Sequence, residues 1–120
     1  MIITQTPAKE LDIREEEAFG LSRAAVLLDQ AKQNRDDAQA LAAALNHNLE
    51  LWVAIRSMVQ RPESGLPKSV GENLIRLSKF VADATFKSSD DLESTTIDTL
   101  ININLQISEG LLEGLANDLR

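Results

Sequence analysis

The sequence contains no cysteine and no tyrosine, and it has one tryptophan, one histidine and three phenylalanines among 120 residues. Without cysteine there is no disulfide framework, no thiolate metal site and no cysteine nucleophile. The lack of cysteine also fits a reducing compartment. So few aromatic residues cannot supply the stacking platforms that bind single-stranded nucleic acid.

The charge balance excludes further classes of partner. The formal net charge is −7, whereas binding to duplex nucleic acid or to an anionic membrane surface relies on clustered Lys and Arg. No apolar run approaches the roughly 18 residues needed to cross a bilayer. The N-terminus, MIITQTPAKELDIREEE, lacks a basic region followed by an apolar one. We therefore expect no secretory signal.

No catalytic or metal-binding motif is present. The chain has no Gly-rich phosphate loop and no His-Glu-x-x-His sequence. The acidic pairs at 36–37 and 90–91 precede helical segments, where capping explains them. His47, the lone histidine, falls on the polar side of its segment. We predict no catalytic residue, no cofactor and no metal, and hence a protein that is not an enzyme.

Apolar residues recur at three- and four-residue spacing through most of the chain, and no sustained alternation indicates a strand. The pattern predicts an all-α, single-domain helical bundle of about four amphipathic helices. An extended or frayed arm is expected over residues 1–12. The sequence RPESGLP at 61–67 is the clearest break. The expected helices cover 12–34, 36–60, a segment from Pro67 or Ser69 to about 87, and 95–119.

The last expected helix is organised around a wide apolar face. Ile97, Leu100, Ile101, Leu105, Ile107, Leu111, Leu112 and Leu115 fall within roughly 160° of arc. Asn104 and Ser108 lie near the middle of that arc. A buried asparagine needs a hydrogen-bond partner, so we expect Asn104 to pair with Asn48 or Arg56 and to set the register of the helices. On this reasoning, Asn104→Leu would leave stability near neutral or higher while making the packing of the helices less unique.

A few apolar residues lie outside the predicted core stripes and are candidates for contact with a partner, although each could be an ordinary exposed hydrophobic residue. These residues are Phe19, Val26, Ile75, Phe86 and Ile103. By contrast, the larger apolar residues Trp52, Phe80, Leu100 and Leu111 are expected in the core.

Three blocks follow one another in a definite order. The first is REEEAFGLSRAAVLL at 14–28. The second joins NLELW at 48–52 to Pro62, a Leu-Pro turn at 66–67 and LIRLSKFV at 74–81. The third is LININLQISEGL at 100–111. Together they resemble the FlaF family, small helical proteins of flagellar biosynthesis in α-proteobacteria. The chain departs from the family in having no tyrosine in its N-terminal arm and Leu105 where a basic residue is expected.

The resemblance implies a cytoplasmic protein that binds newly made flagellin, through the terminal helices of flagellin, and supports its secretion and filament assembly. It also implies an alternative, a regulator of flagellin synthesis that acts through a protein partner such as FlbT without a lasting flagellin complex. The apolar faces alone would also permit a homo-oligomeric structural bundle.

Overall fold

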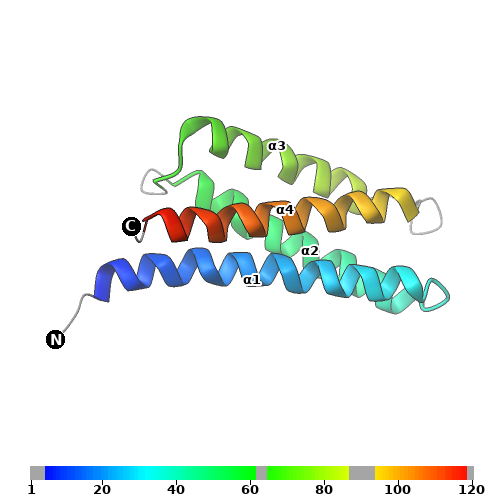
Figure 1. The fold of residues 1–120 in the computed structure, drawn as a ribbon. Coiled ribbons are helices and arrows are strands. Elements are labelled where there is room, and N and C mark those ends of the chain that lie inside the picture. Colours follow the sequence, from blue (N-terminus) through cyan, green and yellow to red (C-terminus); the bar gives the residue numbers. More distant parts are fainter. Residues whose placement is uncertain (1–4, 62–64, 87–93, 119–120) are drawn as a thin grey trace.

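The computed structural model describes residues 5–61, 65–86 and 94–118 (Figure 1). All regular elements in these ranges are α-helices: α1 (Gln5–Gln33), α2 (Ala38–Val59), α3 (Lys68–Thr85) and α4 (Ser94–Asp118). The predicted all-α class is therefore confirmed. The molecule is elongated, with principal extents of 53 × 28 × 18 Å.

The main packing contacts join α4 to α1, α1 to α2, and α2 to α3, so the bundle is not symmetric. Helix α4 runs antiparallel along α1, while α2 packs against both α1 and α3 (Figure 1). Helix α3 therefore lies at one edge of the bundle. The wide apolar surface of α2 has two neighbours to cover it, as its sequence pattern predicts. Within the described residues, no helix is long and apolar enough to cross a membrane.

Helix α1 begins earlier than the sequence pattern indicates. It starts at Gln5 rather than near Asp12, so the predicted arm over residues 1–12 is wrong from Gln5 onward. Pro7 falls in the first turn, where a missing backbone N–H removes no intrahelical hydrogen bond. Residues 1–4 of the predicted arm lie outside the described residues.

The helix starts correct two further details. The sequence favours Asp36 as the cap of α2, but it is the carboxylate of Asp37 that caps this helix, by accepting a hydrogen bond from Ala40 N at 3.0 Å. Pro67 caps α3 through its carbonyl, which accepts from Gly71 N at 3.0 Å. The helix therefore begins at Lys68, between the two predicted starts at Pro67 and Ser69. Gly65, with φ of 70°, provides the left-handed turn that precedes it.

The core runs along the middle of the bundle. Ala18, Leu21, Ala25 and Leu28 form the buried stripe of α1, as their spacing predicts. Helical spacing also places Ala38 and Val70 on the core faces of α2 and α3, but both are exposed. Each lies at the N-terminal end of its helix. The central cluster consists of Leu21, Leu28, Ala31, Leu41, Ala44, Leu45, Trp52, Ile55, Leu74, Val81, Ala84, Ile97 and Leu100.

Candidate functional site

Polar side chains meet in the centre of this apolar core. The indole N–H of Trp52 donates to Asn104 Oδ1 at 2.9 Å. Asn104 Nδ2 donates to Asn48 Oδ1 at 2.7 Å and to Leu21 O at 3.4 Å. Asn48, Trp52 and Asn104 are all 0% exposed. Of the two predicted partners of Asn104, Asn48 is confirmed, whereas Arg56 is exposed. The contact of Asn104 with Trp52 was not predicted, although a buried indole N–H generally needs an acceptor.

A second polar contact lies one turn further along α4. Ser108 Oγ donates to Ala18 O at 2.7 Å, and the Ser22 and Ser108 hydroxyl oxygens are 2.8 Å apart. A serine hydroxyl has one proton. Because Ser108 gives its proton to Ala18 O, Ser22 donates to Ser108. These bonds hold α4 against α1.

The buried asparagine and serine cluster is structural rather than chemical. Its members are neutral and sealed from solvent, so they offer neither a titrating group nor access to a substrate. Within the described residues, no group of His, Cys, Asp and Glu side chains could hold a metal ion. What the cluster does is fix the rotation of α4, since only one orientation turns Asn104 towards α2 and Ser108 towards α1.

This rotation differs from the one that the apolar arc predicts. Leu105 and Leu112, predicted in the core face, are 46% and 38% exposed. Ile103, predicted on the polar side, is half-buried and packs against the core cluster. The inward face runs from Ile103 to Ile101 with the fully buried Leu100 and Asn104 near its centre, so it is turned by roughly 30° towards Ile103. Leu105 and Leu112, at one edge of the predicted arc, therefore fall outside the buried face.

The predicted contact residues lie in different parts of the fold. Phe19 and Val26 lie on α1 and are 58% and 53% exposed. Phe86 follows α3 and is 77% exposed, whereas Ile75 on α3 is half-buried. Together with Ile103 on α4, they do not form one surface. Whether any of them contacts a partner stays a prediction.

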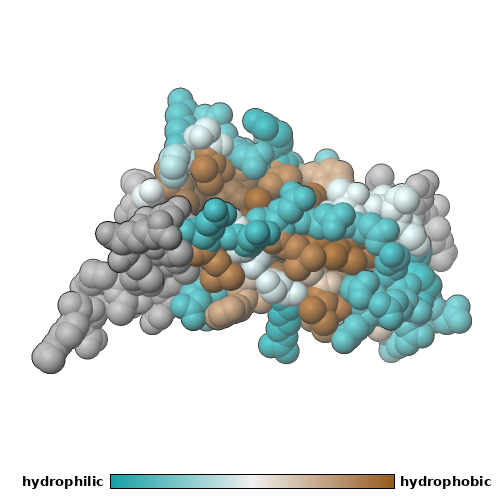
Figure 2. All heavy atoms as spheres, viewed as in Figure 1, coloured by the Kyte–Doolittle hydropathy of each residue, from teal (hydrophilic) through white to brown (hydrophobic). Residues whose placement is uncertain are grey.

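Four exposed apolar residues from two helices nevertheless follow one line, which we call the α1/α4 seam: Phe19, Val26, Leu105 and Leu112. Each helix contributes two residues seven positions apart, and the Ser22–Ser108 contact falls midway between both pairs. Because the helices are antiparallel, Phe19 lies at the same end as Leu112, and Val26 at the same end as Leu105. Figure 2 shows hydrophobic side chains in this band, framed by hydrophilic ones.

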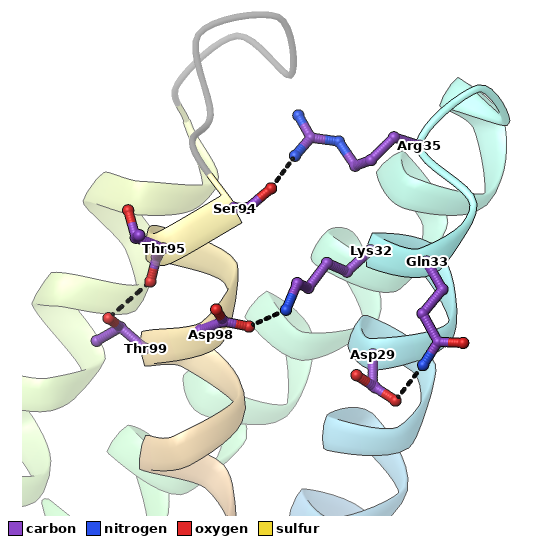
Figure 3. A network of polar contacts seen from close by, with 8 residues as sticks. All are labelled: Asp29, Lys32, Gln33, Arg35, Ser94, Thr95, Asp98 and Thr99. Atoms are coloured by element: carbon purple, nitrogen blue, oxygen red, sulfur yellow. Dashed lines mark hydrogen bonds and ion pairs between the residues drawn. The ribbon is translucent and has the colours of Figure 1, made fainter.

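Polar contacts join α1 to α4 beyond the Val26–Leu105 end of the seam (Figure 3). Lys32 Nζ pairs with Asp98 Oδ1 at 2.6 Å, and Arg35 donates to Ser94 Oγ at 3.3 Å. Both contacts join the C-terminal part of α1 to the first turns of α4. They are exposed or partly so, hence they add little stability but restrict how α4 slides along α1.

An open groove separates the other side of α4 from α3. It is lined by Phe80, Asp83, Ala84, Thr95, Thr96 and Thr99. Phe80 is 41% exposed there, so its predicted place in the core is wrong. The reason is that α3 packs on α2 and leaves little contact with α4.

Glu17 is an unusual acidic group on α1, near the Phe19–Leu112 end of the seam. Its side chain is half-buried, and within the described residues its Oε2 has no hydrogen-bond partner. Burial raises the pKa of the Glu17 carboxyl above its ordinary value of 4.5, and the negative charge of Glu16 adds to that rise. The folded protein therefore binds a proton at Glu17 more readily than the unfolded chain does.

The raised pKa makes a prediction about stability. Through this group, stability falls as pH rises from the ordinary glutamate pKa past the raised folded pKa. We expect Glu17→Gln to raise the urea midpoint at pH 7, and the difference from wild type to shrink as pH is lowered towards 4.5. Urea titrations at several pH values measure both effects. Glu72→Gln, an exposed change on α3, is the matched control and should show neither; a pH-independent difference for Glu17→Gln would contradict the assignment.

Comparison with known proteins adds an independent result. No curated protein and no solved structure matches this chain. The family model described as flagellar protein FlaF matches residues 4–111. That range contains Asn48, Trp52, Asn104 and Ser108 and covers nearly the whole chain. This protein therefore belongs to the FlaF family of flagellar proteins.

Proposed function

We propose that this FlaF-family protein binds flagellin in the cytoplasm as a chaperone, and so supports flagellin secretion and filament assembly. The observation that carries the proposal is the set of large apolar side chains left exposed on an acidic helical bundle, foremost those of the α1/α4 seam. Exposed large apolar side chains that gather along one line of the surface often mark a site of interaction.

The physics of an export substrate favours this function. Helix-forming segments with one apolar face associate with one another unless that face is covered. A helical protein that offers an apolar strip can cover it by receiving the segment as an amphipathic helix. The net charge of −7 keeps the binding protein itself soluble and separate. No catalytic step is required, so the protein acts by binding alone.

Size-exclusion chromatography with purified flagellin tests the proposal. The two proteins should elute together at micromolar concentration, and flagellin lacking its terminal helices should elute apart from the FlaF-family protein. Two separate peaks with intact flagellin would overturn the proposal. A pull-down that recovers FlbT but no flagellin would instead assign the protein to control of flagellin synthesis.

A further inference from the structure

We propose that the α1/α4 seam is a docking site for a single amphipathic helix that carries Lys or Arg on its flanks at the Phe19–Leu112 end. The inference deepens the proposed function, on which it rests for the identity of the natural partner. It names the surface that binds and the charge that the bound helix must have.

The shape of the seam suits a helix. Phe19 and Val26 are seven residues apart on α1, and Leu105 and Leu112 are seven apart on α4. Seven helical residues span about 10 Å, which is also the distance between positions i and i+7 of a docked helix. An apolar stripe with i, i+3, i+4 and i+7 spacing therefore meets both ends of the seam at once.

Hydrogen bonds beneath the seam hold α1 and α4 in a fixed position relative to each other. Ser22 and Ser108 are hydrogen-bonded directly between the two pairs of apolar residues, and Ser108 is anchored in turn to the backbone of α1. Asn104 and Ser108, which are buried, occupy inward positions of α4, and the two leucines lie on the outer edge of that helix.

The charges around the seam are not evenly distributed. Glu15 and Glu16 on α1 and Glu109 and Glu113 on α4 are exposed near the Phe19–Leu112 end. Among the described side chains, none of these carboxylates takes part in an ion pair. Arg23, an exposed cation on α1, lines a groove between α1 and α2 instead. Unpaired carboxylates beside an apolar strip favour a partner with basic flanks.

The same charges disfavour a second copy of this chain as the occupant. Two chains with a net charge of −7 repel each other. A cationic helix is instead attracted, and salt should weaken its binding because the carboxylates are exposed.

The test uses a labelled helical peptide as the probe and the full-length protein as the receptor. The peptide carries leucines at i, i+3, i+4 and i+7 and lysines on the flanks of one end; a second peptide has glutamate in place of each lysine. Fluorescence anisotropy should give at least about tenfold tighter binding for the lysine peptide. Its affinity should fall as NaCl is raised. Equal affinity of the two peptides would overturn the proposal.

Matched variants locate the site. Phe19→Ser with Leu112→Ser should weaken binding of the lysine peptide by at least about tenfold. Phe86→Ser and Val53→Ser, which alter side chains 77% and 57% exposed elsewhere on the protein, should change binding by less than about twofold. If the seam variant does not fold by circular dichroism, Glu109→Gln with Glu113→Gln replaces it. That pair should weaken binding and flatten its salt dependence, and unchanged binding would count against the proposal.

Parallel measurements with flagellin separate the two proposals. If the lysine peptide binds at the seam but flagellin does not bind, the docking site stands and the proposed function fails. If flagellin binds and the seam variant binds it unchanged, the proposed function stands and the docking site is wrong. Sedimentation of the protein alone provides a third check, because a dimer that the seam variant abolishes would assign the seam to self-association.

Discussion

Replacing Asn104 with leucine is expected to lower the free energy of unfolding by about 2–4 kcal/mol. Asn104 is fully buried and serves both Trp52 and Asn48. Leucine would leave the indole N–H of Trp52 without an acceptor and Asn48 Oδ1 without a donor, at positions that water cannot reach. Each unsatisfied buried group costs about 1–3 kcal/mol. The structure therefore predicts a loss of stability where the sequence alone predicts none, because Asn104 has several buried partners.

A double-mutant cycle shows how this free energy is distributed. Asn48→Leu combined with Asn104→Leu should destabilise less than the sum of the two single changes, because the second change removes the group that the first leaves unpaired. Urea denaturation of the four proteins gives the coupling energy, for which we expect about 1 kcal/mol or more. Strict additivity, or an Asn104→Leu protein as stable as wild type, would show that the buried polar cluster contributes nothing to stability.

Truncating Trp52 should have the largest effect of any single change in the bundle. Trp52→Ala removes a side chain that is 0% exposed in the central cluster, and such large-to-small changes cost about 3–5 kcal/mol. For a domain whose total stability is about 5–15 kcal/mol, that is a major fraction. Thermal melts followed by circular dichroism should show a large fall in Tm.

Two related variants divide the effect of Trp52. Trp52→Phe keeps much of the ring packing but removes the N–H that donates to Asn104, so its loss of stability should be smaller than that of Trp52→Ala. Val53→Ala, at the adjacent position that is 57% exposed, should alter the free energy of unfolding by no more than about 0.5 kcal/mol. A Trp52→Ala protein that melts like the Val53→Ala protein would contradict the central position of Trp52.

Helical periodicity alone predicts the architecture of four α-helices. The apolar stripe of α1 and the burial of Trp52 and Leu100 follow from spacing, and the need of a buried amide for a partner makes Asn48 one of two candidate partners of Asn104. These properties depend on which residues share a face within one helix, and this is set by the 3.6-residue repeat. The order of three short blocks sufficed to indicate the family, which the match over residues 4–111 shows.

Only the tertiary structure decided which way each face turns. Periodicity places Leu105 and Leu112 at one edge of the apolar side of α4, yet the helix packs with that edge outward, in an orientation held by hydrogen bonds from Asn104 and Ser108 to other helices. These partners are more than 50 residues away in sequence, so no local pattern reports them. The α1/α4 seam arises from that rotation, because it brings two exposed leucines beside Phe19 and Val26. The sequence by itself determined the helices and most of their buried residues, and packing between distant segments determined the surface that is left to bind.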